Sequence, residues 1–172
     1  MTSLPPGVTI GLPVEDDAPC IARLSRDVIE HGLPWSYRPE RVRRMLRHPD
    51  NVAAVARDGA TLAGFALIEV GEEAAHLVLL AVQPAWQGRG VGQALLHWVL
   101  ACARTAGVAV VRVETRAANQ RAIDLYRRAS FVPTTRIAGY YSGREDAQRL
   151  VLVLRDPGVT LPAPWTPSAA RR

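Results

Sequence analysis

A cluster of glycines in the middle of the chain has the residue types and spacing of an anion-binding loop. Gly88, Gly90 and Gly92 alternate with larger residues, directly after a strand-like segment and directly before a helix-like one. Because glycine lacks a Cβ, backbone N–H groups here can approach a phosphate closely, and the N-terminus of the following helix adds a favourable dipole. Arg89 can add a charge-assisted hydrogen bond. The cluster therefore predicts a site for a phosphorylated ligand.

Two other interpretations apply to the glycine cluster. A dinucleotide-binding fold requires Gly-x-Gly-x-x-Gly in its first strand–turn–helix unit, whereas position 93 is glutamine and the cluster lies mid-chain. That fold is therefore disfavoured. A tight turn that only brings a helix and a strand together remains open as the alternative without a ligand.

The basic residues of the chain are all arginines, since the sequence contains no lysine. A Gly-Lys-Ser/Thr phosphate loop, a Schiff-base lysine for pyridoxal phosphate and the ATP-binding lysine of a protein kinase are therefore excluded. Residues 1–86 carry 8 arginines and 11 acidic residues, a net charge of −3, whereas residues 87–172 carry 13 and 5, a net charge of +8. The second half should attract anions. Because its arginines form no continuous basic arm, a small phosphorylated ligand is favoured over nucleic acid.

Metal binding and membrane insertion find no support in the sequence. Cys20 and Cys102 are isolated, which favours buried, inert thiols, and the histidines have none of the spacings typical of metal sites. The N-terminus lacks the basic start and apolar core of a leader peptide, and no uncharged stretch reaches membrane-spanning length. We therefore expect a cytoplasmic protein without a metal.

Strand and helix patterns alternate along residues 7–154 and predict an α/β domain. Strands are expected at 7–12, 52–57, 61–70, 75–82, 108–115, 131–137 and 149–154. Helices are expected from Asp16 or Asp17 to Glu30, from Pro39 to Arg47, from the glycine cluster to about Ala106, and over 119–129. The sheet should be antiparallel at one end and parallel where strand, helix and strand follow each other. A single domain should span 1–154, followed by a proline-rich tail over 155–172.

The glycine cluster also matches a family signature. The chain resembles the GNAT superfamily of acetyl-CoA-dependent N-acetyltransferases, whose pattern Gln/Arg-x-x-Gly-x-Gly/Ala is met by Gln87, Gly90 and Gly92. In the family the pattern follows a strand that ends in Val-x-Pro, met here by Val82 and Pro84. The resemblance covers about residues 7–154 and implies the GNAT fold, a mixed, largely antiparallel sheet with a splayed central strand pair and flanking helices.

A second signature of the family, Asn-x-x-Ala-x-x-x-Tyr, is met at Asn119, Ala122 and Tyr126, in the expected order and spacing. Within the superfamily, the chain is most similar to bacterial enzymes that acetylate the N-terminal alanine of a ribosomal protein. The segments that carry this closer resemblance are Pro34-Trp35, residues 113–119, Tyr140-Tyr141 and residues 143–147.

The resemblance implies a binding mode for acetyl-CoA. In the family, backbone amides of the glycine loop hold the pyrophosphate of CoA, and the edge of the preceding strand pairs with the pantetheine arm, here through Leu80 and Val82. A splay or bulge near Val82 would point its N–H at the thioester carbonyl as an oxyanion donor. The implied cofactor-binding residues are Leu80, Ala81, Val82, Gln87, Gly88, Arg89, Gly90, Val91, Gly92, Asn119, Ala122 and Tyr126.

The resemblance also implies two catalytic residues. A glutamate at the position of Glu114 takes the proton of the acceptor amine through a water molecule, and a tyrosine at the position of Tyr126 protonates the departing CoA thiolate. A carboxylate suits the first task if its pKa is raised, and a phenol with a pKa near 10 suits the second. From the residues alone, Glu114 can instead be an outward-facing strand residue and Tyr126 a core aromatic.

The resemblance assigns acceptor binding to Pro34, Trp35, Tyr140 and Tyr141, although the two tyrosines can equally be an edge-strand pair. An α-amine titrates near 7.7–8.0 and a lysine side chain near 10.4, so removing the lysine proton at neutral pH costs about 3.4 kcal/mol more. We therefore expect the acceptor to be the α-amine of a protein or peptide N-terminus, such as that of a ribosomal protein, attacked directly in a ternary complex. A small-molecule amine acceptor and a non-catalytic acyl-CoA- or nucleic-acid-binding role remain alternatives.

Two positions depart from the family pattern. The residue before Phe131 is usually glycine, but here it is Ser130, which would cost about 1 kcal/mol in a left-handed backbone conformation. One residue, Ser142, separates Tyr141 from Gly143, fewer than in the similar bacterial enzymes. The peptide-recognition loop is therefore expected to differ.

Overall fold

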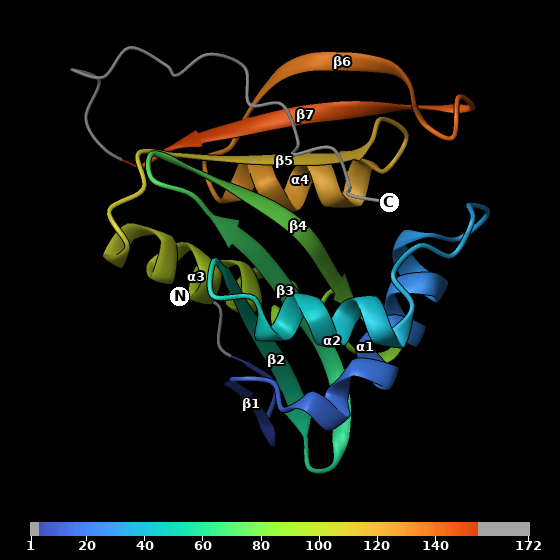
Figure 1. The fold of residues 1–172 in the computed structure, drawn as a ribbon, viewed down its shortest axis with the longest axis vertical. Helices are drawn as coiled ribbons and strands as arrows, with labels where there is room; N and C mark the ends of the chain where they lie inside the picture. The colour runs from blue at the N-terminus through green and yellow to red at the C-terminus, as the bar shows by residue number, and fades with distance from the viewer. Residues whose placement is uncertain (1–3, 155–172) are drawn as a thin grey trace.

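A seven-stranded sheet organises residues 4–154, the part of the chain that the structure, a computed structural model, describes (Figure 1). The strands are β1 (Val8–Gly11), β2 (Asn51–Asp58), β3 (Thr61–Val70), β4 (Ala74–Val82), β5 (Val110–Arg116), β6 (Val132–Tyr141) and β7 (Glu145–Val153). Their order across the sheet is β1-β2-β3-β4-β5-β7-β6, and of the neighbouring pairs β4 and β5 alone are parallel. The expected α/β fold, with a parallel pair inside a largely antiparallel sheet, is confirmed. The expected tail over 155–172 lies outside the described residues.

Helices cover both faces of the sheet (Figure 1). α1 (Ala18–Leu24) and α2 (Pro39–Arg47) pack on one face, and α3 (Val91–Thr105) and α4 (Gln120–Arg128) pack on the other. Because both faces are covered, β3 is buried continuously from Leu62 to Ile68, with Phe65 and Leu67 in one core and Ala66 and Ile68 in the other. Within residues 4–154, no helix has the length and apolar character needed to cross a membrane.

The parallel pair separates part-way along its length. β4 and β5 are paired from Ala74 with Val110 to Leu77 with Val113, and the register ends there. β4 nevertheless continues to Val82 and β5 to Arg116, and Figure 1 shows the two strands diverging. The expected splay of the central strand pair is therefore confirmed, and it opens a gap between the two strand ends.

A β-bulge in β4 lies at the start of this gap. Leu67 of β3 faces Leu79, but the next residue, Ile68, faces Leu77, so Val78 is the extra residue on β4. Of the splay or bulge expected near Val82, the structure has the splay, because the bulge lies four residues earlier and Val82 keeps a regular partner in Gly64. A bulge strengthens the local twist of a strand, which turns β4 away from β5 where their pairing ends.

The first expected helix, ending at Glu30, is shorter and less regular than its apolar pattern indicates. α1 ends at Leu24, and residues Ser25–Ile29 form a π-helical turn. The N–H of Glu30 donates to the carbonyl of Ser25 (2.9 Å), and the Ser25 hydroxyl donates to the Glu30 carboxylate (3.2 Å). This buried polar pair fixes the wide turn, and the hydrophobic periodicity carries no signal for it.

The last two strands are longer than expected. β6 continues to Tyr141, beyond the expected end at residue 137, and β7 begins at Glu145 instead of Arg149. β6 is an edge strand that pairs with β7 alone, so many of its side chains are exposed and its sequence lacks the alternation of a half-buried strand. The extension places Tyr140 and Tyr141 at the end of a hairpin.

Ser130 has a left-handed backbone conformation, with φ of 69°, as its position before Phe131 led us to expect. Ser130→Gly should therefore raise the free energy of unfolding by about 0.5–1 kcal/mol, measured by urea denaturation, because glycine adopts this conformation without strain. Gly107→Ser, at φ 82° after α3, is the converse control and should lower it by a similar amount. A Ser130→Gly protein of lower stability would contradict this account.

Candidate active site

A cavity of about 380 Å³ lies where the end of β4 meets the glycine cluster and the start of α4; we call it the glycine cleft. It brings together the two sequence signatures, which are far apart along the chain. Its lining residues are Val28, Leu80, Ala81, Val82, Gln87, Gly88, Gly90, Gly92, Gln93, Asn119, Arg121, Ala122, Leu125 and Arg128.

The glycine loop is held in a shape that requires glycine. Gly88 and Gly90 have φ angles of 75° and 84°, and Gly90 is the N-cap of α3. The first N–H groups of an α-helix have no intrahelical acceptor, so the loop presents backbone donors and the positive end of the helix dipole beside the cleft. Val91 is fully buried, and neither Val91 nor Arg89 lines the cleft.

Gln87 fastens this loop to its surroundings. Its side-chain Nε2 donates to the carbonyl of Val82 (2.8 Å), and its Oε1 accepts from Arg121 Nη1 (2.5 Å). Arg121 and Arg128 also line the cleft from α4 but were not among the predicted site residues. The basic character of that helix was a signal for them, since an anion site needs cations near it.

The backbone of β4 turns alternate groups toward the gap. The N–H of Gln83 donates to Ala63 on β3 (2.8 Å), so in an extended strand the backbone groups of Val82 and Leu80 point the other way. The Val82 carbonyl is bound by Gln87. Leu80 lines both the glycine cleft and the next cavity inward, which places it at their junction.

That second cavity, the inner cavity, has a volume of about 120 Å³ and lies between the separated strands. Glu114 from β5 and Tyr126 from α4 both line it, so the structure brings the two expected catalytic residues together. Asn119 and Ala122 of the second signature also line it, and they connect it to the glycine cleft.

Glu114 is buried and held by a histidine and an arginine. Its side chain is 5% exposed; one carboxylate oxygen lies 2.6 Å from His76 Nε2, and the other accepts from Arg149 Nε at 2.7 Å. Burial opposes ionisation of Glu114, but the hydrogen bonds and charges of His76 and Arg149 outweigh it and hold its pKa below the ordinary value. The expectation of a raised pKa is therefore wrong, and so is an outward-facing Glu114.

The contacts that lower the pKa of Glu114 come from strand register. Arg149 on β7 lies directly opposite Glu114, and His76 on β4 is opposite Arg112, two residues before Glu114 on the same face of β5. His76 and Arg149 were not among the predicted site residues. Neither has a local signal, because their proximity to Glu114 depends on which strands are neighbours.

Tyr126 packs in the hydrophobic core and also lines the inner cavity. Its ring is 5% exposed and packs against Phe131 with centroids 5.6 Å apart. Burial raises the pKa of the Tyr126 hydroxyl, so it stays protonated at neutral pH. A protonated hydroxyl beside a cavity can donate a proton to an anion formed there.

A third cavity, of about 360 Å³, opens beyond Glu114; we call it the tyrosine cavity. Glu114, Tyr141, Ile29, Val78 and Leu79 line both this cavity and the inner one, so the two are adjacent. Its other lining residues are Glu30, Leu33, Pro34, Ser36, Tyr37, Arg41, His76, Tyr140 and Ser142.

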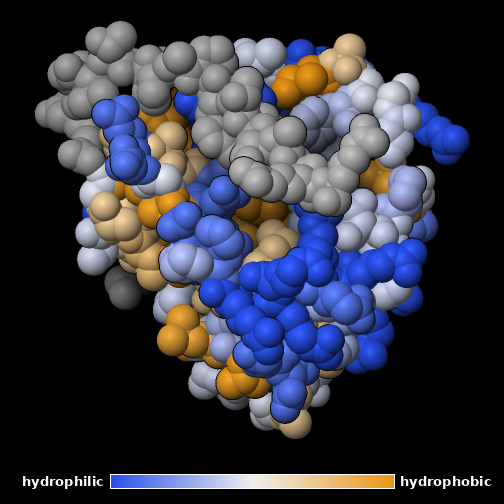
Figure 2. Space-filling view, viewed as in Figure 1, coloured by the Kyte–Doolittle hydropathy of each residue, from blue (hydrophilic) through white to orange (hydrophobic). Residues whose placement is uncertain are grey.

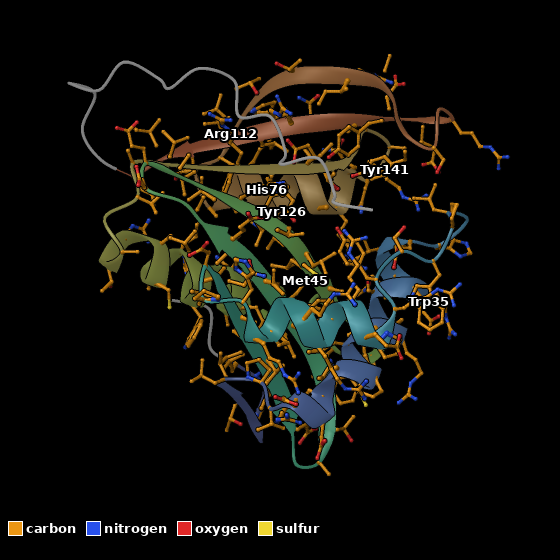
Figure 3. All side chains as sticks on the ribbon, viewed as in Figure 1. Trp35, Met45, His76, Arg112, Tyr126 and Tyr141 are labelled. Carbon is orange, nitrogen blue, oxygen red and sulfur yellow. The ribbon has the colours of Figure 1, made fainter. Side chains whose placement is uncertain are left out.

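Of the four residues expected to bind the acceptor, three line the tyrosine cavity and one does not. Tyr140 and Tyr141 pack edge to face, with centroids 5.0 Å apart, and line the tyrosine cavity with Pro34. The Trp35 ring does not line it; its Nε1 donates to the Tyr37 carbonyl (3.1 Å), and two guanidinium groups lie against it. Figure 3 shows Trp35 well apart from Tyr126 and His76. Tyr37, which sequence analysis missed, takes the aromatic position in the cavity.

Arg116 ties the two walls of the tyrosine cavity together. Its Nη2 donates to the carbonyls of Ile29 (3.0 Å) and His31 (2.5 Å), and its Nη1 donates to Glu145 (2.7 Å). Its guanidinium also lies 5.7 Å from the centroid of the Tyr141 ring. The segment before α2 and the β6–β7 hairpin are therefore fixed relative to β5.

Comparison with known proteins explains this arrangement. Residues 22–131 match the family model described as the acetyltransferase (GNAT) family. The chain belongs to the GNAT acetyltransferase family. It is 37% identical over 137 residues to the N-alpha-acetyltransferase RimI of Mycobacterium tuberculosis, which covers 76% of this chain and 82% of that protein. The GNAT chain described here is therefore an acetyl-CoA-dependent N-acetyltransferase.

Solved structures share its fold. The ribosomal-protein-S18-alanine N-acetyltransferase from Escherichia coli superposes with a TM-score of 0.75 at 28% identity, covering 89% of this chain and 99% of that chain. NAA60 from Arabidopsis thaliana, solved in complex with acetyl-CoA, superposes with a TM-score of 0.76 at 21% identity, covering 86% and 98%. Among the described residues of this GNAT chain, no three His, Cys, Asp or Glu side chains lie close enough together to hold a metal ion.

Gly90→Ala should weaken CoA binding about tenfold, measured by isothermal titration calorimetry. Alanine is strained at φ 84°, so the loop must shift and displace the amides that face the glycine cleft. Gly59→Ala is the matched control, because Gly59 has φ 56° in the β2–β3 turn, away from the cleft. Both variants should lose about 1 kcal/mol of stability. Equal CoA affinity in the two variants would contradict the role of the loop.

Proposed function

We propose that this N-acetyltransferase transfers the acetyl group of acetyl-CoA to the α-amine of a protein or peptide N-terminus, by direct attack in a ternary complex. The observation that carries the proposal is the position of Glu114, which lines both the inner cavity, adjoining the glycine cleft, and the tyrosine cavity. Cofactor and acceptor can therefore approach one carboxylate from opposite sides. The printed activities of the relatives, an N-alpha-acetyltransferase and a ribosomal-protein-alanine N-acetyltransferase, support the choice of acceptor.

The cofactor occupies the glycine cleft in this proposal. Backbone amides of the glycine loop bind the pyrophosphate, and Arg121 and Arg128 neutralise phosphate charge from α4. The pantetheine arm takes the place of the missing strand partner beside β4, at Leu80 and Val82. Its thioester then lies at the junction of the two cavities, where the Leu80 N–H is the oxyanion donor.

The acceptor enters through the tyrosine cavity. Its ammonium group gives a proton to Glu114, directly or through a water molecule, and the freed lone pair attacks the thioester carbon. The tetrahedral intermediate collapses, the C–S bond breaks, and the CoA thiolate takes a proton from Tyr126. The second proton of the attacking nitrogen then restores the Tyr126 hydroxyl as the amide forms. Because His76 and Arg149 keep Glu114 a weak base, an α-amine suits it better than a lysine, which is about 3.4 kcal/mol harder to deprotonate.

CoA release with an alanine-starting peptide tests this function directly. The control is the same peptide with its N-terminus already acetylated, which removes the α-amine and nothing else. We expect turnover with the free peptide and none with the blocked one. Turnover with small amines but not with the free peptide would overturn the proposal and assign the enzyme to a metabolite or antibiotic amine.

Glu114→Gln should lower kcat at least about 100-fold and leave the affinity for CoA unchanged, because the amide keeps the shape but cannot take the proton. Steady-state kinetics with one alanine-starting peptide, and calorimetry with CoA, measure the two quantities. Glu73→Gln, at an exposed position on the β3–β4 turn, is the matched control. A Glu114→Gln enzyme with wild-type kcat would contradict the assignment of the base.

Arg149→Gln should move the acidic limb of the activity profile to higher pH. Burial favours the protonated form of Glu114, and removing the Arg149 guanidinium, which opposes the effect of burial, raises the pKa of Glu114. Activity, which needs the carboxylate, is then lost at a higher pH as the solution is acidified. The measurement is kcat/KM against pH with one peptide, so that the ionisation of the acceptor is the same in every enzyme.

Arg136→Gln is the control for that profile. Arg136 lies on the same hairpin and pairs with Asp146 instead of Glu114. Its profile should superimpose on that of the wild-type enzyme. An acidic limb that does not move in Arg149→Gln would contradict the role of the ion pair.

A further inference from the structure

The carboxylates that line the tyrosine cavity are already used by the fold. Glu30 is 5% exposed and accepts hydrogen bonds from the N–H groups of Ser36 (2.5 Å) and Tyr37 (3.2 Å) and from the Ser25 hydroxyl (3.2 Å). Glu114 is held by His76 and Arg149. The lone pairs of Glu30 are therefore used within the fold, and the remaining acceptor capacity of Glu114 serves the α-ammonium of the acceptor, so a further cationic side chain finds no spare carboxylate among these two.

Arg41, in contrast to these carboxylates, is a charged residue of the cavity without an ion-pair partner among the described residues. It lines the tyrosine cavity from α2, with its guanidinium carbon 4.5 Å from the centroid of the Tyr37 ring. Among the residues that the structure describes, no carboxylate lies within ion-pairing distance of it. Stacking on an aromatic ring leaves the edge of a guanidinium group, and hence its donors, directed outward. The cavity therefore offers a preoriented cation to whatever enters it.

The exposed surface of α2 around Arg41 is mostly basic, whereas Glu30 and Glu69 are the acidic groups that act on Tyr37. Arg38 and Arg44 lie one helical turn before and after Arg41, both exposed, and Glu40 is the single acidic residue of α2. Figure 2 shows a dense hydrophilic surface over this helix. Arg47, by contrast, is paired with Glu15. The field at the α2 side of the cavity is thus positive and attracts negative charge.

We propose that the tyrosine cavity selects N-terminal segments that carry an acidic side chain shortly after the first residue, and that Arg41 binds that side chain. The proposal rests on the proposed function, because it places the α-amine at Glu114 and the following residues along the α2 side of the cavity. A carboxylate of Asp or Glu can accept two parallel hydrogen bonds from the guanidinium group. An arginine or lysine at the same position meets Arg41 and its neighbours and is repelled.

Three peptides of equal length test the preference. They begin with alanine and differ only at the second and third residues, which are both glutamate, both glutamine or both arginine. We expect kcat/KM to fall in that order, with at least about a tenfold difference between the first and the last, and the difference should shrink as salt is added. Equal values, or a preference for the arginine peptide, would overturn the proposal.

Charge reversal identifies the residue responsible. Arg41→Glu should reverse the order of the peptides, mainly through KM, and Arg41→Gln, which has the size of glutamate without its charge, should flatten it. Arg43→Glu is the matched control, because it makes the same change in charge on the same helix at a residue that does not line the cavity. Thermal unfolding checks that each variant keeps the stability of the wild-type enzyme despite the loss of the contact between Arg41 and Tyr37.

The outcomes separate the two proposals. Peptides that are all acetylated without a charge preference, or a preference that survives Arg41→Glu, would overturn the assignment of Arg41 and leave the proposed function standing. A complete lack of turnover with every peptide would overturn both.

Discussion

The divergence of β4 from β5 beyond Leu77 and Val113 is the feature on which the site depends. Paired strands satisfy each other's backbone groups and leave no room between them, whereas here the backbone of β4 from Leu80 to Val82 lines an open cleft. The bulge at Val78 turns the strand at the required place. The two strands also carry the chemistry: β4 leads into the glycine loop, and β5 carries Glu114 at the point where the gap begins.

The ion pairs around Glu114 change what this carboxylate can do. A buried glutamate without partners would be protonated easily and could act as an acid; with His76 and Arg149 bound to it, Glu114 is ionised and weakly basic. Such a base suits an acceptor whose own pKa is not far above neutrality. Tyr126 has the complementary environment, because burial keeps its hydroxyl protonated until an anion forms beside it. The two environments divide the acid and base roles.

The parts of the site that depend on local backbone conformation could be predicted from the sequence. The glycine loop and the order of the strands and helices follow from residue types at fixed spacing, and the left-handed Ser130 follows from the glycine that is usual at its position in the resembling family. The bulge at Val78, the contacts of His76 and Arg149 with Glu114, and the place of Tyr37 and Arg41 in the tyrosine cavity could not be predicted. They arise from strand register and from a π-helical turn, which depend on contacts between segments far apart in the chain.

The most direct test of the central claim is a crystal structure of the enzyme with a bisubstrate conjugate. In this conjugate, CoA is joined covalently through an acetyl group to the α-nitrogen of an Ala-Glu-Glu peptide. The account predicts pantetheine in the gap beside Leu80 and Val82, the linking amide in the inner cavity beside Glu114, and the peptide leaving through the tyrosine cavity past Arg41. A conjugate whose peptide leaves by another route, with its amide away from Glu114, would contradict it.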